Sequence, residues 1–199
     1  SVTDSFTITV ANTNDAPTIT STAVTSVDED SAYSYTTTAT DVDSGDTVTL
    51  TCTTVPSWMS CTSGAMSGTP ANGDVGAHSV VITASDGIAS VTDSFSVTVA
   101  NTNDAPTISS TAVTSVDEDS AYSYTITTAD DDSDTITLTG TTVPSWLTFT
   151  ASTGVLAGTP TNDEVGSHSV VITASDGNGG SVTDSFSIAV ANTNDAPTI

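Results

Sequence analysis

Apolar and polar residues alternate along much of the chain. Phe95, Val97 and Val99 are separated by serine and threonine, and residues 80–84 and 48–50 show the same alternation. A period of two, carried by β-branched and aromatic residues, is typical of strands with one buried face. Since no stretch shows a helical period, the pattern predicts an all-β fold.

The same segments occur more than once in the chain, which indicates internal repeats. The hexapeptide Ser1–Phe6 recurs at Ser90–Phe95 and Ser181–Phe186, and Asn14–Ile19 recurs at Asn103–Ile108 and Asn194–Ile199. A unit of about 90 residues with short strands and frequent turn signals is the size of a β-sandwich. We therefore expect tandem Greek-key β-sandwiches of about seven strands each.

The repeat boundaries predict the domain organisation. Residues 16–104 and 105–199 form two repeats, and residues 1–15 are the last strand and linker of a preceding repeat. In the first repeat the pattern predicts strands near residues 20–25, 32–40, 47–54, 59–61, 65–67, 77–85 and 90–100. A second interpretation of residues 1–10 stays open, in which they add as a donor strand to a neighbouring molecule.

Charge narrows the possible partners. The chain has no Lys or Arg and 24 Asp and Glu, for a formal net charge of −24. Nucleic acids and anionic membranes bind proteins through basic side chains, so both are excluded as partners. No apolar run reaches the roughly 18 residues of a membrane span, which argues against membrane insertion.

Acidic residues gather at matching places in the two repeats. In the first repeat they lie at residues 28–30, at Asp41, Asp43 and Asp46, at Asp86 and in the linker 101–104. Calcium needs about six to eight oxygen ligands, and a D-x-D step can direct two carboxylates at one ion. The alternative is that these residues are solvated loop acids and turn formers. With no basic residue as counterion, calcium is the preferred interpretation.

The order of motifs resembles cadherin-like modules. The motifs are G-V-L-A-G-T-P at residues 154–160, V-V-I-T-A-S-D-G at 80–87 and 170–177, the last strand with its phenylalanine, and N-x-N-D-x-P. The closest resemblance is to the dystroglycan-type cadherin-like and putative immunoglobulin-like repeats of bacterial surface proteins. It covers both repeats and implies a seven-stranded Greek-key sandwich with calcium between successive modules.

The resemblance also implies the calcium ligands. Matched residue by residue, they are Asn12, Asn14, Asp15, Glu29, Asp41, Asp43, Asp86, Asn101, Asn103, Asp104, Glu118, Asp130, Asp132, Asp176, Asn192, Asn194 and Asp195. One complete junction combines Glu29, Asn101, Asn103, Asp104, Asp130, Asp132 and Asp176. The family's D-R-E motif is missing, and Ala105 replaces an asparagine of classical cadherins. We therefore expect one or two ions at each junction.

Cys52 and Cys61 are the only cysteines, and Gly140 and Phe149 stand at their places in the second repeat. Because both are replaced together, we expect a disulfide formed in an oxidising compartment. The alternative is a pair of buried free thiols. A zinc site is less favoured, because two cysteines without a nearby histidine do not make a full ligand set.

Two aromatic positions recur in both repeats. Trp58 and Trp146 each follow Pro-Ser, and we expect them to fill the core, although carbohydrate stacking is the alternative. His78 and His168 share one repeat position, where a structural role is expected.

No catalytic motif is found, and every acidic cluster is duplicated, whereas an active site normally occurs once. The chain is therefore expected not to be an enzyme. We interpret it as the stalk or shaft of an extracellular surface protein, with neighbouring repeats as its first partners. The alternatives are a filament subunit that assembles with copies of itself, a module that binds cell-surface carbohydrate or protein, and an accessory domain of a secreted hydrolase.

Overall fold

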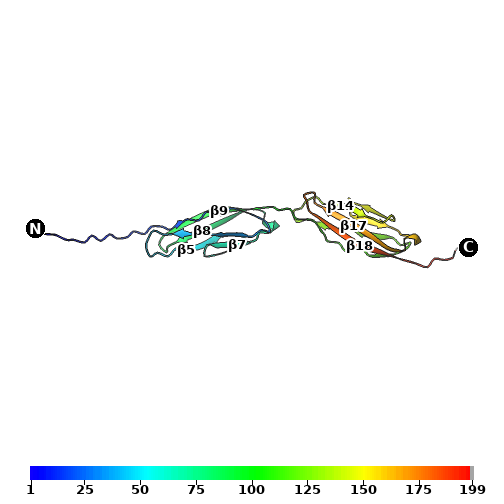
Figure 1. The fold of residues 1–199 in the computed structure, drawn as a ribbon, viewed down its shortest axis with the longest axis horizontal. Coiled ribbons are helices and arrows are strands. Elements are labelled where there is room, and N and C mark those ends of the chain that lie inside the picture. Colours follow the sequence, from blue (N-terminus) through cyan, green and yellow to red (C-terminus); the bar gives the residue numbers. More distant parts are fainter. Residues whose placement is uncertain (198–199) are drawn as a thin grey trace. The chain divides into compact units, whose positions relative to one another are not determined.

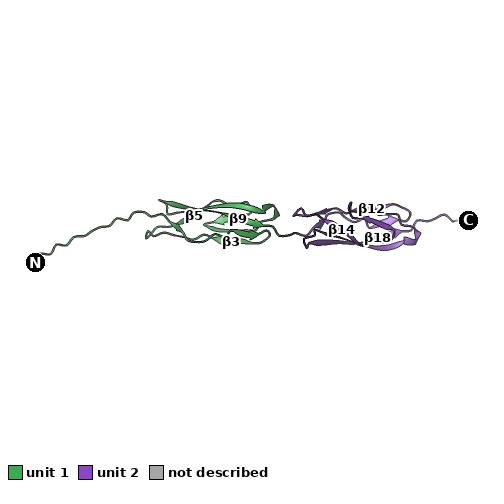
Figure 2. Ribbon diagram, turned by 90° about the horizontal axis from the view of Figure 1, so that it is seen from above, with its two compact units in different colours: residues 1–102 green, residues 103–199 purple. Residues whose placement is uncertain are grey.

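The computed structural model describes residues 1–197 and divides the chain into two compact units. Unit 1 comprises residues 1–102 and unit 2 begins at Asn103 (Figure 2). Apart from two short 3₁₀ turns, Asn72–Asp74 and Asn162–Glu164, the regular structure of the described residues is β-strand (Figure 1). The all-β prediction is confirmed.

Unit 1 contains strands β1 to β9 in chain order. Their bounds are β1 Thr18–Ile19, β2 Ser26–Asp28, β3 Tyr33–Thr36, β4 Ala39–Thr40, β5 Thr49–Thr54, β6 Met59–Thr62, β7 Ala65–Gly68, β8 Gly76–Ser85 and β9 Ser90–Ala100. One sheet has the order β2-β9-β8-β5 and the other β3-β7-β6, while β1 pairs with β4. Successive segments of the chain thus alternate between the two layers of a sandwich.

Unit 2 repeats this arrangement. Its strands are β10 Thr107–Ile108, β11 Ser115–Asp117, β12 Tyr122–Thr125, β13 Thr128–Ala129, β14 Thr137–Thr142, β15 Leu147–Thr150, β16 Val155–Gly158, β17 Gly166–Ser175 and β18 Ser181–Ala191. The sheets have the orders β11-β18-β17-β14 and β12-β16-β15, and β10 pairs with β13. The two units therefore share one topology.

Two of the predicted strands differ from the structure. The strand expected near residues 20–25 is wrong, because the chain there crosses from the pairing of β1 with β4 to the pairing of β2 with β9. The strand expected over 32–40 is interrupted between β3 and β4. The sequence pattern also missed that β2 runs parallel to β9, with Val27 opposite Val99.

The core of each sandwich consists of the inward positions of the long strands. Val80, Ile82 and Val97 of unit 1 are fully buried together with Tyr33 and Met66. The intervening residues of β8 and β9, largely serine and threonine, face outward. The alternation seen in the sequence thus separates a dry interior from a hydroxyl-rich outer face.

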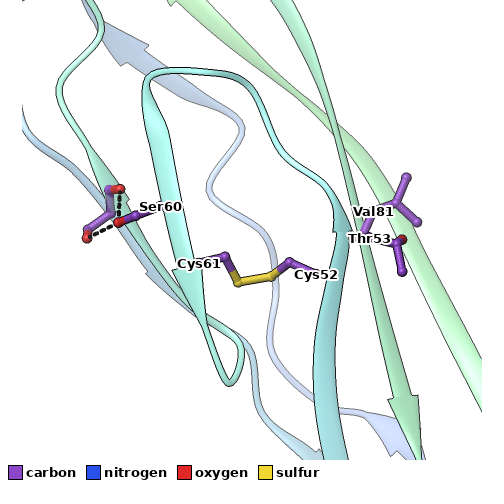
Figure 3. Close-up of a disulfide and its surroundings, with 6 residues drawn as sticks. Cys52, Thr53, Ser60, Cys61 and Val81 are labelled. Carbon is purple, nitrogen blue, oxygen red and sulfur yellow. Dashed lines mark hydrogen bonds between the residues drawn. A yellow bond between two sulfur atoms is a disulfide. The ribbon is translucent and has the colours of Figure 1, made fainter.

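A disulfide joins the two sheets of unit 1. Cys52 on β5 is bonded to Cys61 on β6, with the Cα atoms 6.3 Å apart (Figure 3). In unit 2, a Cβ added to Gly140 would lie 2.7 Å from Val143 Cγ2 and 3.1 Å from Phe149 Cδ1, so Val143 and the phenylalanine ring fill the space beside the glycine. The predicted disulfide is confirmed, and its replacement in unit 2 is a matched small–large pair.

Candidate metal centre

An acidic loop lies between β4 and β5 of unit 1. Carboxylate oxygens of Asp41, Asp43 and Asp46 lie within 4.8 Å of one another. The loop folds this way because the backbone N–H of Asp43 donates to Asp41 Oδ1 at 2.8 Å, an Asx turn that Asp favours. The D-x-D step therefore brings its carboxylates together.

The corresponding loop of unit 2 lies between β13 and β14. Oxygens of Asp130, Asp132 and Asp134 lie within 4.8 Å of one another. Asp46 and Asp134 belong to these clusters, although the resemblance assigns neither as a ligand. Their spacing from the D-x-D pairs is visible in the sequence and is the signal that identifies them.

The segment that precedes the first strand of each sandwich is held against the acidic loop of the same unit. In unit 1, Asn12 Nδ2 donates to Asp43 Oδ1 at 2.8 Å, and the backbone N–H of Asp15 donates to Asp43 Oδ2 at 2.6 Å. In unit 2, the backbone N–H of Asp104 donates to Asp132 Oδ2 at 2.6 Å. The structure thus brings the linker residues and the D-x-D pair predicted from the sequence to one end of each unit.

Asp86 and Asp176 organise the hairpin that follows β8 and β17. Asp86 Oδ1 accepts the backbone N–H groups of Ile88 and Ala89 at 2.6 Å each, while Asp86 Oδ2 accepts Asn14 Nδ2 at 3.0 Å. These bonds, with the one from Ala89 contributing most, lower the pKa of Asp86 below its ordinary value. Both oxygens of Asp86 thus have a structural task.

Asp176 has the same arrangement in unit 2. Its Oδ2 accepts Asn103 Nδ2 at 2.8 Å, and its Oδ1 accepts the backbone N–H of Asn178 at 2.7 Å. The Asn103 amide is the largest influence that lowers the pKa of Asp176, and the backbone bonds add to it. A metal role for either aspartate remains a prediction, because each already accepts several hydrogen bonds.

At the opposite end of each unit lies a buried glutamate. Glu29 and Glu118 are each 1% exposed. Glu29 Oε1 accepts the backbone N–H of Thr102 at 2.7 Å, and Glu118 Oε1 accepts that of Thr193 at 2.6 Å. The second oxygen of each glutamate is buried and has no hydrogen-bond partner. A buried carboxylate oxygen without a partner is unfavourable unless a cation or proton compensates it.

Unpartnered buried oxygens also occur in the acidic loops. They are Asp41 Oδ2, Asp130 Oδ2 and Asp132 Oδ1. The pKa of Asp46 is raised, first by desolvation and then by the neighbouring carboxylates of Asp43, Asp41 and Asp86. An oxygen-only donor set of this kind, in a chain without Lys or Arg, fits a hard divalent cation such as calcium.

Other predicted ligands lie apart from these clusters. Asn192 Nδ2 donates to the Thr193 carbonyl at 3.0 Å, and Asn194 Nδ2 donates to the Asp195 carbonyl at 3.2 Å. Asn101 is exposed after β9, and Asp195 is exposed near the end of the described chain. Their roles stay predictions.

The recurrent aromatic residues pack inside the sandwiches. Trp58 packs against the core of unit 1, with its ring centroid 5.7 Å from Tyr33 and 5.9 Å from His78, both edge-to-face. His78 Nε2 lies 2.6 Å from the carbonyl oxygen of Asp74. Trp146 and His168 repeat this stack in unit 2. The geometry supports the core and structural interpretations of these residues.

Comparisons with known proteins agree with the fold. The family model described as Putative Ig domain matches residues 16–100 and 105–191. No curated protein matches the chain. Among the described residues, no helix is long and apolar enough to cross a membrane.

Similar folds occur among solved structures. Extracellular cadherin domains 1–5 of Protocadherin Gamma B2 are 17% identical, with a TM-score of 0.57 over 92% of this chain and 41% of that chain. Domains EC1-2 of human Protocadherin-24 are 20% identical, with a TM-score of 0.53 over 85% of this chain and 95% of that chain. At such identities the likeness shows the fold alone.

A further solved structure has a higher sequence identity and a lower TM-score. The endo-fucoidan hydrolase MfFcnA4 from glycoside hydrolase family 107 is 28% identical over 90% of this chain, with a TM-score of 0.40. This chain spans 29% of the length of that hydrolase.

Proposed function

The chain belongs to the Putative Ig domain family in two tandem copies, and from this premise we propose that it is a structural repeat segment of an extracellular protein, stiffened by calcium. The observation that carries the proposal is the buried glutamate with one unpartnered oxygen, present at the same place in both units. A carboxylate kept in this state at each repeat is explained by a cation that binds there.

The proposed ligands come from two parts of each repeat. The glutamate of a repeat, Glu29 or Glu118, binds the ion at the junction with the next repeat in the chain. The linker and D-x-D carboxylates of a repeat, such as Asp104, Asp130 and Asp132, bind the ion at the junction with the previous repeat. We propose that each junction combines the first set from one repeat with the second set from the next. Calcium supplies positive charge there, while the linker and loop residues hold the oxygens in place.

The role of such an array is reach and stiffness. The linker Asn-Thr-Asn-Asp-Ala-Pro is short, and its proline restricts the backbone. Extracellular modules bind calcium with dissociation constants of about 10⁻⁴ to 10⁻³ M, so the joints would be rigid outside the cell. The disulfide Cys52–Cys61 also favours an oxidising compartment. We propose an adhesin stalk or the shaft of a fibre at the cell surface.

We further propose that residues 1–10 close a preceding repeat. Their sequence matches β9 and β18, and here they form no strand. Val2, Phe6, Ile8 and Val10 are each at least 75% exposed. Homotypic assembly by strand addition is the second candidate function, and it rests on the same exposed apolar side chains. A catalytic role is not proposed, because the acidic clusters are duplicated.

Isothermal titration of calcium into residues 1–199 tests the proposal. We expect saturable binding in the millimolar or submillimolar range, and we expect Asp132→Asn to lose at least one site. Asp163→Asn is the matched control, because it removes the same charge from an exposed position in the 3₁₀ turn Asn162–Glu164. Equal binding by both variants, or no saturable binding by the wild type, would overturn the proposal.

A further inference from the structure

The long strand β9 has a complete partner on one side and a partial partner on the other. It pairs with β8 from Ser90 to Val99, whereas β2 pairs only with Thr98–Ala100. The preceding strand β1 pairs with β4 instead. The first half of β9 therefore has an edge without a strand partner among the described residues.

Backbone direction along β9 shows which groups point to this edge. Thr98 N–H donates to the Thr25 carbonyl at 2.9 Å, and the Ala100 carbonyl accepts Glu29 N–H at 2.9 Å, both toward β2. In a regular strand, alternate residues direct both N–H and C=O to the same edge. Thr92, Ser94 and Ser96 thus present their N–H and C=O groups to the open edge.

A groove follows the open edge. It has a volume of about 360 Å³, with residues 17–19 and Ser21 on one wall and residues 91–93 on the other. Ile19 and Val91 give it apolar surface, while Ser21 and Asp93 are polar. The groove thus offers backbone hydrogen bonds, apolar contacts and one carboxylate side by side.

The edge has only part of the usual protection against pairing, the inward-facing carboxylate of Asp93. Natural edge strands carry lysine, proline or bulges that block the approach of another strand. The outward side chains along this half of β9 are instead serine and threonine, as at Thr92, Ser94 and Ser96. An unpaired backbone row next to a groove suits an extended segment that adds as a further strand.

The net charge of the chain determines which kind of extended segment the open edge of β9 attracts. The chain carries −24 and has no Lys or Arg, so this edge favours a basic segment of another protein over a second copy of the chain. A basic side chain near Asp93 would be attracted. We propose that the groove between β1 and β9 binds an extended segment of another protein by strand addition, with a lysine or arginine of that segment beside Asp93. This groove lies next to the acidic loop, since Thr18 in its wall pairs with Thr40, the residue before Asp41. Its lining includes none of the acidic-loop carboxylates, and the proposal does not depend on the calcium proposal.

Unit 2 provides a natural comparison. There β18 pairs with β11 only over Ala189–Ala191, so the same half of the strand is open. However, Tyr124 Oη donates to Asp184 Oδ2 at 3.3 Å, so the carboxylate that corresponds to Asp93 already has a partner. Unit 1 is therefore expected to bind the segment more tightly than unit 2.

A synthetic peptide tests this proposal. The probe is a fluorescent peptide of alternating valine and threonine with one central lysine, about six residues long, the usual length of a strand. Anisotropy in calcium buffer should show saturable binding, and amide NMR shifts should centre on Thr92, Ser94 and Ser96. The same peptide with alternate amides N-methylated should not bind, and a glutamate in place of lysine should weaken it.

Substitutions in β9 and β18 show where the peptide binds. Ser94→Pro removes an N–H that faces the edge, a position where proline is tolerated, and should abolish binding while calorimetry shows a folded protein. Asp93→Asn should weaken the lysine peptide about fivefold, as for a solvent-exposed ion pair, whereas Asp184→Asn should leave unit 1 binding unchanged. No binding of the lysine peptide, shifts away from β9, or self-association through this edge would overturn the proposal.

Discussion

The Glu29 carboxylate accepts the backbone N–H of Thr102 at 2.7 Å. The residue that follows β2 therefore holds the segment that follows β9, next to the parallel pairing of these two strands. Glu118 and Thr193 have the same relationship at 2.6 Å in unit 2. One side chain thus fixes the exit of the chain from each sandwich while its second oxygen remains without a hydrogen-bond partner.

Neutralising this glutamate should have opposite effects with and without calcium. Glu29→Gln keeps an oxygen that can accept the Thr102 N–H but removes the buried charge. In chelator, the free energy of unfolding of unit 1 should stay equal or rise. The rise should not exceed about 3 kcal/mol, the upper end of the penalty for a buried polar group left without a partner. In calcium, the variant should gain less stability than the wild type.

Differential scanning calorimetry in the two buffers measures both effects, with Asp163→Asn as the control of equal charge. For the wild type, calcium at ten times its dissociation constant should add about 1.4 kcal/mol per site by mass action. If Glu29→Gln gained as much from calcium as the wild type, the glutamate would not be a ligand.

The disulfide should stabilise unit 1 and leave unit 2 unaffected. It closes a loop with a sequence separation of 9, for which chain entropy gives about 2–3 kcal/mol. Reductant should therefore lower the melting temperature of one of two calorimetric transitions. The unaffected transition of unit 2, which has Gly140 and Phe149 at these positions, is the internal control. Equal shifts of both transitions would contradict this account.

Acid should weaken both units in the absence of calcium. The folded pKa values of Asp86 and Asp176 lie below their ordinary value of 3.8. Stability from such groups is fully present above the unfolded pKa and is lost as the pH falls through the folded pKa. The free energy of unfolding in chelator should thus decrease as the pH drops below about 4.

Urea titrations at several pH values measure this loss. Asp176→Asn should flatten the pH dependence of the free energy of unfolding of unit 2 and leave that of unit 1 unchanged. Since the raised pKa of Asp46 acts in the opposite direction, Asp46→Asn should steepen the dependence for unit 1. An unchanged slope in Asp176→Asn would show that this carboxylate is not held by its hydrogen bonds.

Much of the sandwich could be predicted from the sequence, because the alternation in segments such as residues 80–84 directly reflects burial on one face. The short strands β1 and β2 were not predicted. β1 pairs with β4 and β2 pairs with β9, so each is set by a distant partner strand and not by a local sequence pattern. The parallel pairing of Val27 with Val99 joins residues far apart in the chain, and nothing in their immediate sequence indicates it.

The acidic site was predicted in part. The linker meets the D-x-D pairs through the backbone N–H groups of Asp15 and Asp104, which donate to Asp43 and Asp132. The role of these residues as calcium ligands stays a prediction. The hydrogen bond from Thr102 to Glu29 and the open edge of β9 depend on where β2 ends. That boundary follows from tertiary packing, so the sequence alone did not reveal either feature.

Small-angle scattering of residues 1–199 in calcium and then in chelator tests the central claim most directly. In calcium, we predict a longer particle with a narrower distribution of dimensions than in chelator. Glu29→Gln should lose this effect of calcium, whereas Asp163→Asn should keep it. Identical scattering of the wild-type chain in the two buffers would contradict a calcium-stiffened array and leave the acids as solvated loop residues.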